Sequence, residues 1–321
     1  MTPAGMPWRP GQRVSVSVPA SSANLGPGFD CVGVGLELRD ECEVAISATP
    51  GVRVTAAGEG AGSVPTDARH LVARSFLRAC EVLGAPAPIG LELRCRNVVP
   101  HSRGLGSSAT AIVTGVGAAY ALWSVATTGR PDMDLDAVND LAAAREGHPD
   151  NSSASVFGQM TLSWLADEQD AAARVQRTTT VRLTPHPLIT PVVFVPEVQL
   201  STATARAVLP SQVRLGDAAA NSVRVGLLVH AMTAAPEMLV PATRDYLHQE
   251  PRRSSYAASM ALVDELRAAG VAATISGAGP SVLALAVGDG AVVAAAKAPA
   301  DWRVLTPGFA SVGLRVEGSS A

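Results

Sequence analysis

The chain has 321 residues, of which 47% are hydrophobic and 17% charged, a balance typical of a compact protein with about two domains and not of a disordered chain. Its formal net charge is −3, without a run of basic residues. This charge argues against nucleic acid and anionic membrane as the main partner.

The first third of the sequence predicts strands followed by a helix. Residues 14–18 alternate apolar and polar side chains, which is the period of a half-buried strand. A polar, turn-rich loop is expected over residues 19–30. The next expected elements are strands at residues 31–38, 42–48 and 52–56, and a helix at residues 70–83. The N-terminal residues lack the apolar stretch of a secretory signal, so we expect a cytoplasmic protein.

The stretch VPHSRGLGSSAT at residues 99–110 is expected to form a glycine-rich loop. It lies between a predicted strand at residues 89–96 and a predicted apolar helix at residues 109–125. Gly104 and Gly106 can adopt positive φ and allow a ligand to approach the backbone closely. The helix start presents free N–H groups at the positive end of the helix dipole, which is a site for anions and most often for phosphate.

Two other interpretations of this stretch remain open. The pentapeptide Gly-Leu-Gly-Ser-Ser is also a plausible connector with a serine N-cap. Residues 104–109 also satisfy the G-x-G-x-x-A pattern of a dinucleotide site. That reading needs an acidic residue about twenty positions on, and the nearest acids, Asp132 and Asp134, follow Pro131 without a strand pattern.

The second half of the sequence predicts a further alternation of helices and strands. In order, the expected elements are a helix from residue 135, a turn cluster at 145–151, a strand at 157–165, a polar linker at 167–180, a strand at 192–195, helices at 217–233 and 255–269, strands at 271–276 and 282–287, a helix at 291–298 and a strand at 313–317. The elements after the linker are expected to form an αβ sandwich.

The cysteine and lysine residues limit the possible metal sites, disulfides and phosphate-binding groups. Cys31, Cys42, Cys80 and Cys95 form no C-x-x-C pair and lack metal-ligand spacing to histidine, which indicates reduced, buried thiols in a cytoplasmic protein. Of the 25 basic residues only Lys297 is a lysine, and the sequence contains neither G-x-x-x-x-G-K-[ST] nor the strand lysine of protein kinases. Any phosphate must therefore be held by backbone amides, arginine and metal.

Three separated motifs resemble those of the GHMP small-molecule kinases. They are PASSANLGPGFD at residues 19–30, P-x-x-x-GLGSSA at residues 100–109 and ISGAGPS at residues 275–281. The resemblance implies an α+β, two-domain GHMP kinase fold. Residues 1–170 would form an N-terminal ribosomal-protein-S5-like α/β domain with the phosphate-binding loop, and residues 171–321 a C-terminal ferredoxin-like αβ sandwich.

Within the family, the first motif, STATARAVLP at residues 201–210 and E-P-x-R at residues 250–253 resemble the members that phosphorylate L-homoserine in threonine biosynthesis. The resemblance therefore implies ATP and L-homoserine as substrates, with Mg²⁺. The expected assembly is a homodimer in the cytoplasm, with neither nucleic acid nor membrane as a partner.

The resemblance also implies which residues contact ATP and the metal. The ATP-binding residues lie in two glycine-rich loops, and they are Pro100, Arg103, Gly104, Leu105, Gly106, Ser107, Ser108, Ala109, Gly277 and Gly279. Ser108 and Glu146 are the expected Mg²⁺ ligands, because this hard cation keeps several waters and takes only one or two protein oxygens.

The implied substrate site matches the charges of an amino acid. Arg206 and Arg253 would bind the carboxylate, and Asp30 with Asn24 would accept from the ammonium. The polar residues expected to complete this site are His148, Asn151 and Thr202.

The residues expected to act in catalysis are Ser108, Glu146, Asn151 and Arg206. Some family members have an aspartate where Asn151 stands, and an amide cannot act as a general base. Phosphoryl transfer depends mainly on positioning and charge neutralisation, so no base is expected. The competing hypotheses are a kinase for another small alcohol, a metabolite-binding module without catalysis and a dinucleotide oxidoreductase.

Overall fold

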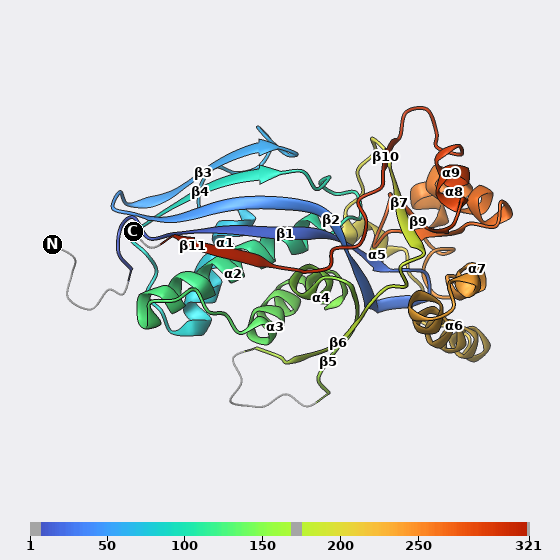
Figure 1. Ribbon diagram of the computed structural model, residues 1–321, viewed down its shortest axis with the longest axis horizontal. Coiled ribbons are helices and arrows are strands. Elements are labelled where there is room, and N and C mark those ends of the chain that lie inside the picture. Colours follow the sequence, from blue (N-terminus) through green and yellow to red (C-terminus); the bar gives the residue numbers. More distant parts are fainter. Residues whose placement is uncertain (1–7, 168–174, 320–321) are drawn as a thin grey trace.

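Two β-sheets with helices packed against them make up the computed structural model, which describes residues 8–167 and 175–319 (Figure 1). The strands are β1 (Arg13–Asn24), β2 (Gly28–Ser47), β3 (Gly51–Gly58), β4 (Gly90–Asn97), β5 (Met160–Leu165), β6 (Thr178–Leu183), β7 (Ile189–Val195), β8 (Ala272–Ile275), β9 (Val282–Val287), β10 (Arg303–Leu305) and β11 (Arg315–Ser319). The helices are α1 (Leu71–Leu83), α2 (Ser107–Thr128), α3 (Leu135–Glu146), α4 (Asp150–Phe157), α5 (Thr202–Ala207), α6 (Leu215–Thr233), α7 (Leu239–Ala242), α8 (Ala257–Ala268) and α9 (Gly290–Ala295), with 3₁₀ turns η1 (Pro236–Met238) and η2 (Arg253–Tyr256).

The larger sheet forms the first hydrophobic core. Its strands run in the order β11-β1-β2-β4-β3, while β5 pairs with β2 and β6 pairs with β5. Val14 and Val16 alternate into the core, as the period of two predicts. Helix α2 packs against β1 and α1 and is long and apolar enough to cross a membrane, but 67% of that window is buried inside the protein. These contacts identify α2 as a core helix.

The smaller sheet, in the order β10-β7-β9-β8, is covered on both faces. Val192 and Phe194 of β7 pack in one cluster with α8, whereas Val193 and Val195 pack in another with α6 and α7. A sheet that is buried on both faces needs apolar residues at successive positions. This explains the unbroken apolar run of β9.

The long strand β2 connects the two cores. Val44 and Ile46 belong to the cluster around α2, while Val32, Val34 and Leu36 belong to the cluster that contains α6 and β7. The β1–β2 hairpin therefore extends from the larger sheet towards the smaller one (Figure 1). Its polar turn is thereby placed where the two halves meet.

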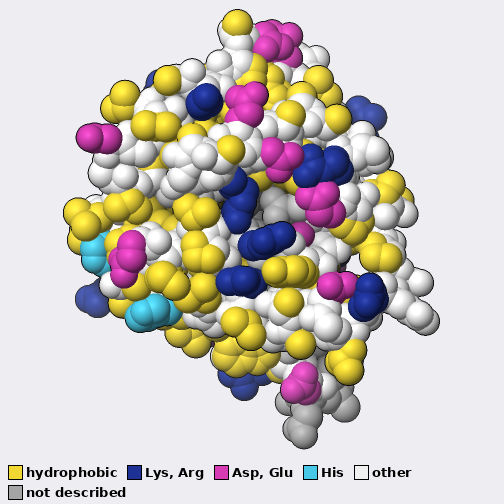
Figure 2. All heavy atoms as spheres, turned by 90° about the vertical axis from the view of Figure 1, so that its right-hand side faces the viewer, with side chains coloured by type: hydrophobic (Ala, Val, Ile, Leu, Met, Phe, Trp, Pro, Cys, Tyr) yellow, Lys and Arg dark blue, Asp and Glu magenta, His cyan; other side chains and the backbone are white. Residues whose placement is uncertain are grey.

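The end of the molecule that carries the smaller sheet faces the viewer in Figure 2. Basic and acidic side chains are interspersed there among hydrophobic ones, and neither sign forms an extended area on this face (Figure 2).

Helix α4 was not expected from the sequence. It occupies part of the turn cluster predicted at residues 145–151, and the strand predicted at residues 157–165 begins only at Met160. Its serines are weak helix formers, but Ser152, Ser153 and Ser155 are buried, and their hydroxyls bond to the protein. Ser153 Oγ donates to Asn139 Oδ1 (3.1 Å) and Ser155 Oγ donates to Pro19 O (3.2 Å). Tertiary hydrogen bonds thus stabilise a helix that the sequence pattern does not indicate.

The loop expected at residues 19–30 is instead mostly strand. Strand β1 continues to Asn24, and β2 begins at Gly28 and runs unbroken to Ser47, joining the two strands expected there. Ser21 and Ser22 are fully buried within β1. A polar stretch of this kind predicts an exposed loop, but here the serine hydroxyls form hydrogen bonds inside the protein, so the segment can be a buried strand.

The division between the sheets also lies elsewhere than predicted. Strand β6, which begins inside the expected linker, pairs with β5 of the larger sheet, so the sheets divide after Leu183 and not at residue 170. Residues 168–174 of that linker lie outside the described part of the chain. Strand β11, expected in the C-terminal sandwich, pairs with β1 of the larger sheet. The short elements α5 and β10 were not expected.

Candidate active site

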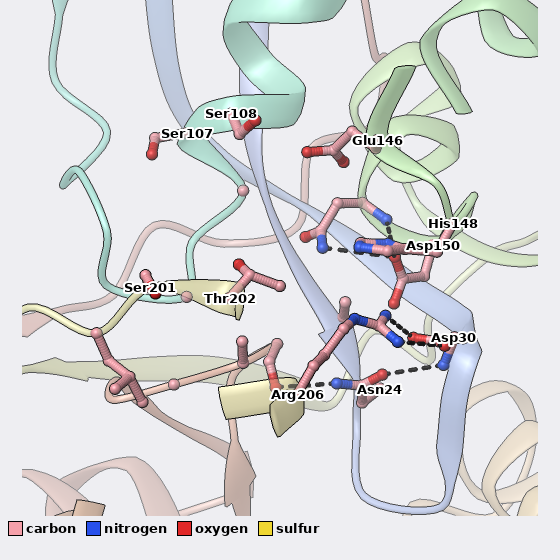
Figure 3. A pocket seen from close by; sticks show the side chains of 18 of the residues that line it. Asn24, Asp30, Ser107, Ser108, Glu146, His148, Asp150, Ser201, Thr202 and Arg206 are labelled. Carbon is pink, nitrogen blue, oxygen red and sulfur yellow. Dashed lines mark hydrogen bonds and ion pairs between the residues drawn. The ribbon is translucent and has the colours of Figure 1, made fainter. Parts of the chain in front are cut away.

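A cavity of about 350 Å³ lies where the β1–β2 hairpin, the start of α2, the α3–α4 connection, α5 and the β8–β9 turn come together (Figure 3). Most of its labelled side chains are polar and come from segments far apart in the sequence. The fold therefore brings together all three motifs singled out in the sequence.

The loop before α2 can be built only with glycine at two positions. Gly104 and Gly106 have φ of 75° and 68°. A Cβ on Gly104 would lie 2.2 Å from Ser276 O, and one on Gly106 would lie 2.1 Å from Ser21 Oγ. Both glycines are therefore required by backbone conformation and by close approach.

Helix α2 begins at Ser107, and Gly106 is its N-cap without any side-chain cap hydrogen bond. The serine-capped connector considered from the sequence is therefore wrong. The first-turn N–H groups of a 22-residue helix lie at the cavity without a capping side chain. This is the arrangement that binds phosphate.

The β8–β9 turn is fastened to this loop and to the hairpin. Ser276 Oγ donates to Gly104 O (2.6 Å), Ser281 N donates to Arg103 O (3.2 Å), and Gly277 N donates to Ala23 O (3.1 Å). These bonds fix both glycine-rich loops on one side of the cavity.

The residues expected to bind ATP divide into two groups. Those that line the cavity are Gly104, Gly106, Ser107, Ser108, Gly277 and Gly279. Those that do not are Pro100, Arg103, Leu105 and Ala109. Leu105 and Ala109 are fully buried under the loop. The Arg103 guanidinium donates to Pro196 O (2.8 Å), Glu197 O (2.7 Å) and His101 O (3.0 Å), so it braces the loop and does not face the cavity.

Glu146, the last residue of α3, faces Ser108 across the cavity (Figure 3). The residue is partly exposed, yet its Oε2 is enclosed and accepts no hydrogen bond from the described residues. Burial raises the pKa of Glu146 to about 7, and the charge of Asp150 adds to this, while His148 and Ser108 oppose it. An enclosed carboxylate oxygen without a partner beside a hydroxyl fits a hard cation such as Mg²⁺.

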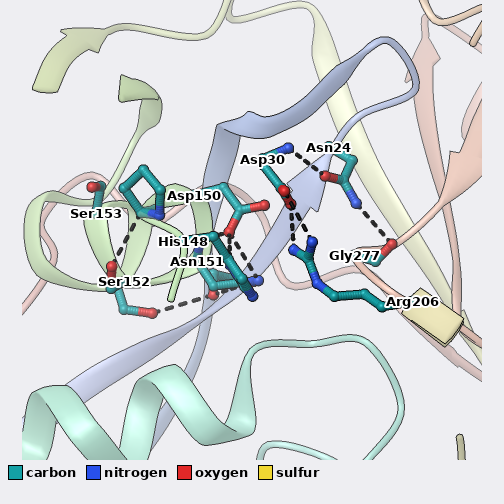
Figure 4. A network of polar contacts seen from close by, with 12 residues as sticks. Asn24, Asp30, His148, Asp150, Asn151, Ser152, Ser153, Arg206 and Gly277 are labelled. Atoms are coloured by element: carbon teal, nitrogen blue, oxygen red, sulfur yellow. Dashed lines mark hydrogen bonds and ion pairs between the residues drawn. The ribbon is translucent and has the colours of Figure 1, made fainter. Parts of the chain in front are cut away.

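A second group of possible metal ligands comprises Asp30, His148 and Asp150, whose ligand atoms lie within 4.8 Å of one another. Several of their polar atoms already have partners, since both carboxylate oxygens of Asp30 accept from Arg206. His148 Nδ1 lies 2.7 Å from Asp150 Oδ1, which also accepts from Asn151 N (2.7 Å) (Figure 4). Burial lowers the pKa of His148, but the hydrogen bond and charge of Asp150 outweigh it, and the net pKa is raised. We interpret this group as part of the substrate pocket.

Asp150 is a cavity residue that the sequence analysis missed. It is 1% exposed and holds both His148 and Asn151, which were expected to bind the substrate. The available signal was its position between them in the His-Pro-Asp-Asn sequence. Asn151 in turn lies at the phosphate loop, where its Oδ1 accepts from Ser21 Oγ (3.0 Å).

Asp30 and Arg206 form the charged pair of the cavity (Figure 4). Arg206 Nη1 and Nη2 donate to the two Asp30 carboxylate oxygens at 3.0 and 2.5 Å. Asn24 holds the Asp30 backbone, because its Oδ1 accepts from Asp30 N (3.1 Å) and its Nδ2 donates to Gly277 O (2.9 Å). Asn24 therefore positions Asp30 and connects the hairpin to the β8–β9 turn.

Arg253 is not brought to the cavity, contrary to the expectation from the sequence. Its guanidinium binds Glu250 (2.7 Å) and Asp264 (2.9 Å) at the surface. The neighbouring Arg252 lines the cavity instead and is only 2% exposed. Two adjacent residues at the start of a 3₁₀ turn point in different directions, and the motif alone does not distinguish them.

Arg252 supports Arg206 from behind. Its Nε donates to Ala205 O (2.7 Å) in α5, the helix that carries Arg206. Both guanidinium carbons lie 5.6 Å from the centre of the Phe29 ring, which also stacks on His248. Thr202, at the start of α5, lines the same wall. The cavity therefore has an acidic, metal-suited end at Glu146 and an ion-paired end at Asp30 and Arg206.

A second cavity of about 280 Å³ adjoins the first and shares Ser102, Ser107 and Ser108 with it. Its walls come from α1, the start of α2 and strands β2 and β4, and they include His70 and the apolar side chains of Val64, Pro65 and Leu71. A mostly apolar pocket next to an anion site has the composition expected for binding a planar base.

Both halves of the chain match families of known proteins. The family model described as the GHMP kinases N terminal domain matches residues 70–159, and the one described as GHMP kinases C terminal matches residues 226–302. The chain is 47% identical over 303 residues to a homoserine kinase of Streptomyces coelicolor, covering 94% of each chain. It is 50% identical over 273 residues to one of Streptomyces avermitilis, covering 85% of each.

Solved structures show the same relationship. The chain resembles a homoserine kinase from Cytophaga hutchinsonii with a TM-score of 0.78 and 26% identity, covering 95% of this chain and 97% of the other. It shares its fold with a mevalonate diphosphate decarboxylase from Staphylococcus aureus, at a TM-score of 0.67 and 15% identity, covering 95% and 98%.

Proposed function

The chain belongs to the GHMP kinase family and has the function of a homoserine kinase, and on that premise we propose how its residues transfer a phosphoryl group from ATP to L-homoserine. The predicted α+β, two-domain GHMP kinase fold is confirmed. What supports the proposal is one juxtaposition: a pair of opposite charges, Asp30 and Arg206, shares a cavity with the uncapped start of α2.

The amino-acid end of the substrate would bind at this ion pair. L-homoserine carries both a carboxylate and an ammonium. It can therefore insert between Asp30 and Arg206, so that each side chain pairs with the opposite charge of the substrate. Arg206 would bind the carboxylate by its bidentate fork, and Asp30 would accept from the ammonium. Arg252 takes the place proposed for Arg253, because it lines the cavity and supports α5. Asp150 is added as the residue that orients His148 and Asn151.

ATP would place its triphosphate at the start of α2 and its nucleoside in the second cavity. The two cavities share Ser107 and Ser108, so one molecule can occupy both. The chain carries no P-loop lysine, and the backbone N–H groups of the α2 start supply the anion site instead.

Mg²⁺ would be held by Glu146 and Ser108, with water and phosphate oxygens completing its coordination. When bound, the ion neutralises negative charge on the phosphates during transfer. Glu146 fits this role because its enclosed Oε2 accepts no hydrogen bond from the described residues.

The reaction requires the substrate hydroxyl to face the γ-phosphate. Its oxygen forms a bond to phosphorus while the bond from phosphorus to the β–γ bridging oxygen breaks, and ADP leaves. Asn151, held by Asp150 and bonded to Ser21 next to the phosphate loop, would orient the hydroxyl. Because the transition state is loose, no strong base is needed. The proton leaves to a phosphate oxygen or to water.

A substrate panel tests this function. L-homoserine should be phosphorylated orders of magnitude faster than 3-amino-1-propanol, which lacks the carboxylate, and 4-hydroxybutanoate, which lacks the ammonium, because each leaves one half-buried charge of the Asp30–Arg206 pair without its substrate partner. Mevalonate and galactose serve as substrates of a different shape. The measurement is coupled ADP formation, and equal rates with mevalonate or galactose would refute the proposal.

The two serines of the loop should differ in effect. Figure 3 shows Ser108 turned towards Glu146 and Ser107 on the other side of the helix start. Ser108→Ala should therefore lower kcat about tenfold more than Ser107→Ala, as expected for loss of a group that stabilises charge. Neither substitution removes a helix cap, so both variants should melt like the parent. Equal effects on kcat would assign both serines to the loop backbone only.

The homodimer and the cytoplasmic location stay predictions. The homodimer is expected from the resemblance, and the cytoplasmic location from the cysteine usage and the N-terminal residues.

A further inference from the structure

Two cysteines face each other across neighbouring strands. Cys42 of β2 and Cys95 of β4 are direct partners in the antiparallel register. Their Sγ atoms lie 3.3 Å apart and share a hydrogen bond. Directly opposed residues of an antiparallel pair have Cα atoms about 4.5–5.5 Å apart, which lies within the range that a disulfide spans.

The pair is also accessible from one side. Cys42 and Cys95 are 4% and 6% exposed, and both line the second cavity, next to Ser107 and Ser108 at the start of α2. A small oxidant can therefore reach the sulfurs through the cavity. A ligand that fills the cavity would close this route.

We propose that Cys42 and Cys95 form a reversible disulfide on reaction with a hydroperoxide, and that a nucleotide in the second cavity shields them. The first part stands on the geometry of the pair alone. The second part rests on the proposed function, because that function supplies the nucleotide as the occupant.

The chemistry balances with one equivalent of hydrogen peroxide. The Cys95 thiolate attacks one peroxide oxygen, the O–O bond breaks, and Cys95 becomes a sulfenic acid while hydroxide leaves and takes up a proton as water. The Cys42 sulfur then attacks the Cys95 sulfur, forms the S–S bond and releases a second water. Two thiols are oxidised and one peroxide is reduced.

The order of attack follows from the environment of each sulfur. The hydrogen bond from Cys42 lowers the pKa of Cys95, against the opposing effects of its burial and of Asp40. The pKa of Cys42 is raised by the same hydrogen bond and by its burial. We write Cys95 as the attacking thiol on this basis, and the disulfide that forms is the same whichever of the two sulfurs reacts first.

The other two cysteines provide internal controls. Burial raises the pKa of Cys80 to about 12 and, together with the charges of Asp150 and Asp30, that of Cys31 to about 11. Neither lines the second cavity. Both should remain thiols under conditions that oxidise the pair.

The experiment counts and maps thiols in the full chain. Treatment with hydrogen peroxide should reduce the number of thiols that are titratable after denaturation from four to two, and dithiothreitol should restore four. Mass spectrometry of a non-reduced digest should show the Cys42 and Cys95 peptides joined. Saturating ATP with Mg²⁺ should slow the loss about tenfold, because access controls the reaction. Cys31→Ser should behave like the parent apart from its missing thiol, whereas Cys42→Ser should form no joined peptide.

Four outcomes are informative. Four thiols remaining after peroxide, or a disulfide that involves Cys31 or Cys80, would overturn the site even if Cys42→Ser does not fold, since the parent chain alone decides this. If calorimetry shows nucleotide binding but the oxidation rate is unchanged, the shielding is refuted. If the pair oxidises and no nucleotide binds, the proposed function fails while the disulfide site stands. A mapped Cys42–Cys95 disulfide with ATP protection supports both parts.

Discussion

Replacing Glu146 by glutamine should lower kcat by about a thousandfold or more while leaving the fold intact, as expected when a preorganised charge at the reacting phosphates is lost. Glu146 is the negatively charged residue proposed for the metal, and an amide of the same shape supplies no charge. Glu146→Ala should lose as much. Coupled ADP formation at ordinary and at high Mg²⁺ concentration measures the effect, and near-normal turnover by either folded variant would refute the metal role.

The pH dependence of the stability of Glu146→Gln tests the burial of the carboxylate independently of activity. The folded-state pKa of Glu146, about 7, lies above its ordinary value of 4.5. The side chain therefore favours folding while it is protonated, and this contribution is lost as pH rises through about 7. Without metal, Glu146→Gln should match the parent near pH 4, below the unfolded-state pKa, and be more stable at pH 8, by at most about 3 kcal/mol. An equal difference in melting temperature at both pH values would contradict the buried carboxylate.

Arg206→Leu should raise the KM for L-homoserine by about a hundredfold or more and leave ATP binding nearly unchanged. The substitution removes the proposed partner of the substrate carboxylate and leaves the half-buried Asp30 unpaired. Loss of one partner costs about 2–5 kcal/mol in a fully buried charge pair and less where solvent still reaches the charges. Steady-state kinetics with each substrate varied in turn separate the two effects. Arg206→Lys should recover only part of the loss, because a lysine has no bidentate fork.

Arg253→Leu is the matched control. It removes the same side chain from a surface ion pair with Glu250 and Asp264, and exposed pairs contribute little. Its kinetics should be close to those of the parent. If Arg253→Leu raises the KM as much as Arg206→Leu, or if Arg206→Leu leaves homoserine kinetics unchanged, the assignment of the carboxylate site is wrong.

Local patterns predicted much of this architecture. The apolar run of β9 and the helical period of α1 gave their positions to within a residue or two. The glycine-rich loop before α2 was predictable, because positive φ and close backbone contacts require glycine at Gly104 and Gly106. Helix α4 was not, since buried hydrogen bonds stabilise it against the preference of its serines.

Local sequence patterns could not predict which way a side chain points or which distant strand a strand pairs with. The choice between Arg252 and Arg253 depends on the local course of a 3₁₀ turn, and the role of Asp150 depends on which neighbours its carboxylate reaches. The pairing of β11 with β1 joins opposite ends of the described chain. No window of neighbouring residues contains that information.

The β1–β11 pairing has a consequence for the order in which the protein can assemble during synthesis. Val16 pairs with Val316, and Leu314 packs into the first core and donates its N–H to Val156 O (3.0 Å). A ribosome that has made the first two hundred residues has therefore supplied the glycine loop, Glu146 and Asp30, but not the strand that covers the free edge of β1. Such a distant pairing forms late and slowly, and until then the nascent N-terminal half exposes an unpaired edge to its neighbours.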